Sequence, residues 1–117
     1  MPTKEELYGE AMDLFAEDKY ADSEIKLRQA VEADPDYFEA LHALSMVYYH
    51  QNKLDETIEV GKRLVGIEPE NILAYTTLSM AYQKKGMIPE AEDAGGKAKA
   101  LGFKDMLNKA KAENKKQ

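Results

Sequence analysis

Hydrophobic residues make up 44% and charged residues 32% of this 117-residue chain, which fits a single globular domain with one continuous core. No apolar run approaches the roughly 20 residues needed to cross a bilayer, and the acidic, polar start lacks the pattern of a secretory signal. We therefore expect a cytoplasmic protein with no membrane contact. The absence of cysteine excludes disulfides and thiolate metal sites, and it fits a reducing compartment.

The net charge of −6 is unevenly distributed along the chain. From Lys97 to the end, seven lysines face two acidic residues and give +5, whereas nine basic and twenty acidic side chains before Lys97 give −11. An acidic body argues against a nucleic-acid partner, which needs clustered Lys and Arg. The tail lysines are expected to solubilise the chain end, with an anionic contact as the alternative. They include Lys104, Lys109, Lys111, Lys115 and Lys116.

The first two helices are expected over residues 3–17 and 20–34. Thr3 followed by Glu6 is a capping-box pattern, which places a helix start here. Pro35 ends the pair, because proline does not continue a helix.

Residues 38–69 repeat this arrangement. Apolar and small residues follow i, i+3, i+4, i+7 spacing in the first half, which predicts one buried helical face. Asn52 and Lys53 mark a break, and a second helix then continues to Pro69, 34 residues after Pro35. The face consists of Leu41, Leu44, Ser45 and Tyr48.

The third segment contains a fifth helix, capped by Asn71 and ended by Gly86. Pro89 suits the first turn of a sixth helix, which we expect to end at Leu101 and Gly102. A seventh helix is predicted over residues 103–114, and residues 114–117 are expected to fray. Its apolar stripe, Phe103, Met106, Leu107 and Ala110, would cover the exposed end of a stacked array.

Three units in register at a 34-residue period resemble the tetratricopeptide repeat, whose pattern is W-x₂-L-G-x₂-Y, then A-x₃-F, then P. The first unit matches with Leu7, Glu10, Ala11, Leu14, Ser23, Leu27 and Pro35. The second matches with Leu41, Leu44, Ser45, Tyr48, Thr57, Gly61 and Pro69. The third matches with Tyr75, Leu78, Ser79, Tyr82, Ala91, Gly95 and Phe103.

The resemblance covers about residues 4 to 103 and implies an all-α superhelical solenoid within one domain, residues 1–117. The expected repeats span about 4–37, 38–71 and 72–102, and a capping helix spans about 103–114. This gives seven helices in total. Family members generally bind peptides or helices on a concave face lined by the first helix of each repeat.

A second stripe on these first helices is rotated roughly 100° from the core stripe and is expected to line the concave groove. It has methionine at the centre of every unit, and flexible methionines suit an apolar peptide or amphipathic helix. The nine residues are Tyr8, Met12 and Phe15, then His42, Met46 and Tyr49, then Thr76, Met80 and Gln83. Read singly, each methionine also fits a core position. The stripe lacks the Lys, Asn and Arg set with which one branch of the family grips chaperone carboxylate tails.

Gly61 and Gly95 occupy a slot where the family prefers a large aromatic residue, and glycine inside a helix costs about 0.5 to 1 kcal/mol relative to alanine. One interpretation is that neighbouring tyrosines, such as Tyr48, Tyr49 and Tyr82, fill this space. The other is a weak helix that opens for a partner or exchanges with another chain.

The sequence favours no catalytic, cofactor or metal site. His42 and His50 lie about 12 Å apart along one helix and cannot share a metal, so both are expected to line the groove. Gly95-Gly96-Lys97 lacks the spacing and the Ser or Thr of a phosphate-binding loop. We therefore expect a non-catalytic protein-interaction module that binds an apolar or amphipathic segment, with a self-assembling homo-oligomeric scaffold as the alternative.

Overall fold

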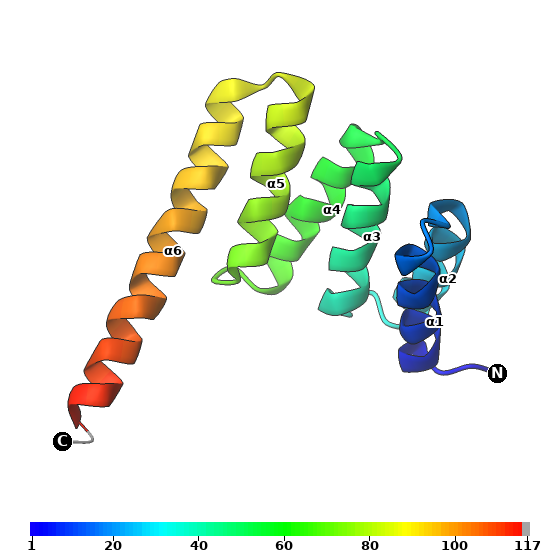
Figure 1. The fold of residues 1–117 in the computed structure, drawn as a ribbon, viewed down its shortest axis with the longest axis horizontal. Coiled ribbons are helices and arrows are strands. Elements are labelled where there is room, and N and C mark those ends of the chain that lie inside the picture. The colour runs from blue at the N-terminus through cyan, green and yellow to red at the C-terminus, as the bar shows by residue number, and fades with distance from the viewer. Residues whose placement is uncertain (116–117) are drawn as a thin grey trace.

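The computed structural model describes residues 1–115. Within these residues the chain forms six α-helices and no strand, arranged as three antiparallel pairs that stack in chain order (Figure 1). The helices are α1 (Lys4–Ala16), α2 (Tyr20–Ala33), α3 (Phe38–His50), α4 (Leu54–Ile67), α5 (Ile72–Lys85) and α6 (Ile88–Lys115). Each helix packs on the next, and α3 also contacts α1 and α5. The predicted all-helical solenoid is therefore confirmed.

The turn inside each pair has the same geometry in all three repeats. Its left-handed residue is Asp18 (φ 62°), Asn52 (φ 61°) or Gly86 (φ 84°), and these residues are spaced by 34. Asp, Asn and Gly are the residues that best tolerate this conformation. After each of them a backbone N–H donates to a carbonyl near the end of the preceding helix, as from Lys53 to Tyr48 at 2.8 Å. The backbone conformation of the turn thus repeats every 34 residues, as the sequence pattern does.

The two helices of each pair meet where both carry a small residue. In the first pair the Ser23 hydroxyl donates to the Ala11 carbonyl at 2.8 Å, and in the third the Ser79 hydroxyl donates to the Ala91 carbonyl at 3.0 Å. These bonds join the two helices and satisfy hydroxyls that would be costly to bury unpaired. In the middle pair, Ser45 and Thr57 bond to backbone carbonyls three and four residues earlier instead.

The core runs through the stack and is densest in the first two pairs. Leu27, Leu41 and Leu64 are fully buried, and each comes from a different helix. A smaller cluster around Leu78 and Ala94 continues the core between α4, α5 and α6. The apolar face expected from the middle segment is buried throughout, with Leu41, Leu44, Ser45 and Tyr48 between 0% and 6% exposed.

Two predicted helix starts are confirmed in detail. Thr3 accepts a hydrogen bond from the Glu6 N–H at 3.1 Å and forms the reciprocal capping box. Asn71 caps α5 by accepting from the Leu73 N–H at 3.0 Å. These side chains satisfy N–H groups that have no partner within the helix.

The predicted seventh helix does not exist as a separate element, because α6 continues through Gly102 to Lys115. The structure therefore contains six helices over residues 1–115 where the sequence predicted seven, and Asn114 and Lys115 are helical rather than frayed. Residues 116 and 117, also predicted to fray, lie outside the described part. Gly102 therefore does not stop the helix, and a Cβ there would lie 3.5 Å from Ile72 of α5, an ordinary van der Waals distance.

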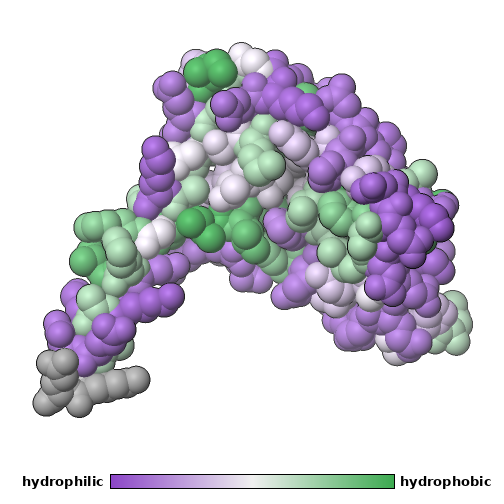
Figure 2. Space-filling view, in the orientation of Figure 1, coloured by the Kyte–Doolittle hydropathy of each residue, from purple (hydrophilic) through white to green (hydrophobic). Residues whose placement is uncertain are grey.

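The second half of α6 extends past the end of α5 and leaves the stack (Figure 1). Every residue from Phe103 to Lys115 is exposed, including Phe103 (59%), Met106 (61%) and Leu107 (45%). Figure 2 shows hydrophobic surface on this part of the helix, among hydrophilic neighbours. The predicted apolar stripe is present, but it does not fold back to cover the array.

The glycines in the aromatic slot serve close packing. A Cβ at Gly61 would lie 2.7 Å from Leu78 Cδ2, and one at Gly95 would lie 3.2 Å from the Ser79 hydroxyl oxygen. At Gly61 the space is thus filled by Leu78 of α5, and not by the tyrosines that the sequence suggested.

In the described part of the chain, no helix is both long and apolar enough to cross a membrane.

Candidate interaction groove

A hollow of about 230 Å³ opens between α3 and α5, the first helices of the second and third repeats. It brings together five of the nine predicted groove residues, which are His42, Met46, Tyr49, Thr76 and Met80. The other residues that line it are Ser45, His50, Thr57 and Thr77. No Asp, Glu, Lys or Arg belongs to this lining.

The two methionines of the hollow are accessible from solvent. Met46 is 37% exposed and Met80 is 45% exposed, although both belong to helices whose opposite faces are buried. Between them, Thr77 (8%) and Ser45 (0%) are buried and close the floor. The arrangement is a shallow apolar depression with polarizable, flexible side chains at its rim.

Two histidines form part of an aromatic rim. The ring of His42 stacks on Phe38 at 6.4 Å, and burial lowers the pKa of His42 below its ordinary value of 6.5. His50 stacks on Tyr20 at 5.0 Å with nearly parallel planes. Both histidines line the hollow. The neutral form of His42 is favoured there, because desolvation penalises the charged form.

The far rim of the hollow carries one cation. The Lys84 ammonium lies 4.4 Å from the centre of the Tyr49 ring, which is within the range of a cation–π contact. The same group approaches the Tyr49 carbonyl oxygen at 3.5 Å. Because Lys84 belongs to the last turn of α5, the hollow is apolar inside and basic at this edge.

The predicted residues of the first repeat lie partly under other aromatic rings. Tyr8 lies 5.7 Å from Tyr37, and Phe15 lies 5.4 Å from both Tyr20 and His50, in centroid distances. All of these side chains, together with Met12, are half-buried against the core except His50, which is exposed. Tyr8, Met12 and Phe15 therefore do not line the hollow between α3 and α5.

Gln83 lies outside the hollow as well, on the rim of a different depression between α5 and α6. Conversely, the helical stripe did not identify Ser45, Thr57 and Thr77 as lining residues. The tetratricopeptide pattern includes Ser45 and Thr57 and therefore predicts that they belong to the core. Whether a residue at the edge of the core also lines a hollow depends on how the neighbouring helix packs. Among residues 1–115, no group of His, Asp or Glu is arranged to hold a metal ion.

Two of the known proteins to which this chain is similar are tetratricopeptide-repeat proteins. No family model matches the chain. A stretch covering 68% of this chain is 34% identical to Sperm-associated antigen 1 of Mus musculus, a tetratricopeptide-repeat protein, and corresponds to 12% of that protein. The crystal structure of MamA, also of this type, superposes with a TM-score of 0.86 at 27% identity, over 90% of this chain and 61% of MamA.

The chain belongs to the tetratricopeptide-repeat family. A further structure of this type, the type III secretion translocator chaperone SycD of Yersinia enterocolitica in an alternative dimer, superposes with a TM-score of 0.81. That likeness covers 93% of this chain and 86% of SycD at 18% identity, so it shows the fold alone. The chain spans about an eighth of the curated relative and about three fifths of MamA.

Proposed function

We propose that this tetratricopeptide-repeat array is a non-catalytic interaction module that binds an apolar peptide or one face of an amphipathic helix in the hollow between α3 and α5. The single observation that supports it is the exposure of Met46 and Met80 side by side in a hollow lined without carboxylates, ammonium groups or guanidinium groups. Exposed methionines at a concave surface adapt to apolar ligands.

The charge of the array specifies the ligand further. Residues before Lys97 carry a net charge of −11, so a ligand with an apolar stripe and basic flanks would be attracted over long range and then desolvated in the hollow. The lining itself is neutral, and because Lys84 makes one edge of the hollow basic, the basic flanks of the ligand are expected to lie away from that edge. The predicted ligand is therefore a basic amphipathic helix with apolar residues at i, i+3, i+4 and i+7.

The test uses a designed, fluorescein-labelled peptide of that pattern and measures anisotropy. Met46→Glu and Met80→Glu are expected to weaken binding at least about tenfold, because each introduces an unpaired carboxylate into the contact. Ile25→Glu is the matched control, since Ile25 is 56% exposed on α2, away from the hollow. Circular dichroism should show all three variants folded, whereas Leu44→Glu (5% exposed) should unfold the chain.

Methyl-labelled methionine gives a second readout on the unmodified chain. Of the six methionines, Met46 and Met80 line the hollow, whereas the other four do not. The peptide should shift the methyl signals of Met46 and Met80 most and leave Met106 unchanged. Shifts confined to Met106, or equal binding by Met46→Glu, would contradict the proposed site.

Self-association is the second candidate function. Helix α6 exposes four large apolar side chains to solvent, and a cluster of exposed apolar side chains often marks an interface. They are Ile88, Phe103, Met106 and Leu107, with exposed fractions of 45% to 61%. This candidate predicts a mass that rises with concentration, and it concerns a surface different from the hollow.

A further inference from the structure

The outward face of α6 is the surface that a next repeat would cover. Thirty-four residues earlier, the matching face of α4 packs under α5, where Ile58 is 9% exposed and Gly61 receives Leu78. On α6 this face is bare, with Ile88 at 47% and Phe103 at 59% exposure. A hollow of about 410 Å³ between α5 and α6 opens on it, lined by Ser79, Gln83, Ile88, Ala91, Glu92, Gly95, Gly96 and Lys99.

The residues on this face are arranged symmetrically, so that a copy of the helix running in the opposite direction places unlike charges opposite one another. At 100° per residue, the residues of the face lie within a sector of roughly 100° around the helix. They are Ile88, Glu92, Gly95, Gly96, Lys99 and Phe103. Their common midpoint lies between Gly95 and Gly96. The acid Glu92 and the base Lys99 lie at equal distances on either side of it, and so do the apolar Ile88 and Phe103.

We propose that this face binds the same face of a second copy, with the two α6 helices antiparallel and crossing at Gly95 and Gly96. A two-fold axis at that point places Glu92 opposite the partner's Lys99 and Ile88 opposite the partner's Phe103, each contact occurring twice. From Ile88 to Phe103 the aligned helices extend over about 22 Å. The occupant is a second copy because only a reversed copy matches both the charged and the apolar pairs.

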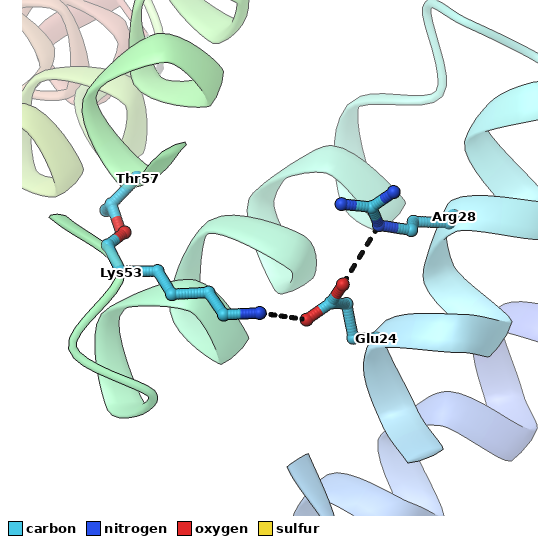
Figure 3. A network of polar contacts seen from close by, with 4 residues as sticks. All are labelled: Glu24, Arg28, Lys53 and Thr57. Carbon is cyan, nitrogen blue, oxygen red and sulfur yellow. Dashed lines mark hydrogen bonds and ion pairs between the residues drawn. The ribbon is translucent and has the colours of Figure 1, made fainter. Parts of the chain in front are cut away.

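The first repeat has a glutamate at the position that corresponds to Glu92, and it pairs with a cation of the next repeat. Glu24 occupies the repeat position of Glu92, 68 residues earlier, and it is 14% exposed. It binds Lys53 of the next repeat at 3.1 Å and Arg28 at 3.0 Å (Figure 3). At this position a glutamate therefore bonds to a cation of the next unit in the stack.

Among residues 1–115, Glu92 has no such cation. None of the ion pairs formed among residues 1–115 involves Glu92 or Lys99. In the antiparallel pair each of these two groups would gain a partner. The shared hollow would remove part of the solvent around both groups and strengthen the attraction between them.

The two central glycines suit a close crossing between helices. A Cβ at Gly96 would meet nothing within 4 Å, so packing within the chain does not require glycine there. Glycine in the middle of a helix is unfavourable compared with alanine. A second helix approaching at this point supplies the reason, because glycine lets two backbones come closer than the usual interaxial distance of about 8 to 10 Å.

The pairing leaves the methionine hollow open. The residues that line the hollow between α3 and α5 and those that line the hollow on α6 do not overlap. The dimer would thus present two copies of the proposed peptide site. The inference rests on the self-association candidate, and it is independent of peptide binding.

The primary experiment measures absolute mass by light scattering after size exclusion, from micromolar to near-millimolar concentration. The full chain is expected to approach twice its 13.2 kDa mass. Glu92→Lys and Lys99→Glu should each raise the dissociation constant at least about tenfold, because each places like charges opposite one another twice. The double variant Glu92→Lys/Lys99→Glu restores opposite charges and should return to within about threefold of the original value.

Gly96→Leu tests the close crossing. It should leave the monomer folded and abolish the rise in mass, since Gly96 has free space within the chain but none at the crossing. Gly66→Leu is the matched control on α4, where a Cβ also meets nothing within 4 Å, and it should keep the dimer.

Three other results would contradict the proposed interface. A dimer that survives Glu92→Lys and Gly96→Leu would show self-association through another surface. A mass that exceeds two copies would contradict a two-fold contact, which closes at the dimer. A constant monomer mass would remove the self-association candidate as well, but it would leave peptide binding in the methionine hollow unaffected.

Discussion

The second helices of the middle and last repeats, α4 and α6, have the same place in the repeat but opposite surroundings. Ile58 of α4 is buried beneath α5, and the residue at the matching position of α6 is the exposed Glu92. Val65 is likewise half-buried, whereas its counterpart Lys99 is exposed. At both positions the helix covered by the next repeat carries an apolar residue, and the uncovered helix carries a charged one.

The strongest test exchanges the residues at this position. Ile58→Glu should destabilise the fold by about 3 kcal/mol or more, because it buries an unpaired carboxylate between α4 and α5. Glu92→Ile should change the stability of the monomer by less than about 0.5 kcal/mol. Urea denaturation of both variants measures the contrast. Equal losses for the two variants would mean that α6 is covered like α4.

The glycines of the two helices should also respond in opposite directions. Gly61→Ala is expected to cost about 1 to 3 kcal/mol, since its Cβ would lie 2.7 Å from Leu78 Cδ2 and 2.9 Å from Leu78 Cγ. Gly96→Ala should instead stabilise the monomer by about 0.5 to 1 kcal/mol, because alanine favours the helix and meets no neighbour. Thermal melts at low protein concentration keep dimerisation from obscuring the second effect.

A smaller effect is expected at the polar link between the first two repeats (Figure 3). Glu24→Gln should lower stability by about 1 kcal/mol, because the charge that holds Lys53 and Arg28 is lost from a site only 14% exposed. Lys26→Gln is the control, since its ion pair with Glu10 has both side chains 38% or more exposed and should contribute little. A comparable loss in both variants would argue against the importance of the link. Chemical denaturation measures both.

The smallest effect concerns pH. The pKa of His42 is lowered by burial, so the unfolded chain binds a proton more readily than the folded chain. The stability contributed by neutral His42 is therefore complete above the unfolded-state pKa of 6.5, and it is lost as the pH falls from 6.5 through the lower folded-state pKa. Asp34 and Glu70 have pKa values lowered below 3.8 and 4.5 by hydrogen bonds from Lys4 and Lys104, so their contributions are lost only at more acidic pH.

Urea midpoints at about pH 7 and about pH 5 measure this histidine effect. The midpoint should fall between the two values for the natural chain and fall less for His42→Gln. An identical fall in both proteins would assign the effect to another group.

Much of the fold could be predicted from the chain because its signals are local. The capping box at Thr3, the turn residues Asn52 and Gly86 and the i, i+3, i+4, i+7 spacing each act within one helix or one turn. The end of α6 could not be predicted in this way. Gly102 resembles a helix stop, but a glycine ends a helix where the backbone turns into the left-handed region, as at Gly86, and at Gly102 the helix continues.

The candidate groove shows the same division. The helical stripe alone selected Met46 and Met80 as neighbours across two helices, and the structure places them in one hollow. It also selected Met12 and Gln83, which lie outside that hollow. The repeat period treats the three units as equal. In the structure, aromatic rings from neighbouring elements partly cover the first unit, and among residues 1–115 no helix packs on the outward face of the third.

By itself, the sequence determined the repeat period, the three helical pairs, their turns and the family. Only the tertiary structure decided which apolar stripes are covered, where the hollow opens, that Leu78 fills the space at Gly61, and that α6 runs on with a bare outward face. The reason is physical. Helix formation depends on residues within a few positions of each other, whereas exposure depends on which distant helix stacks on a given face.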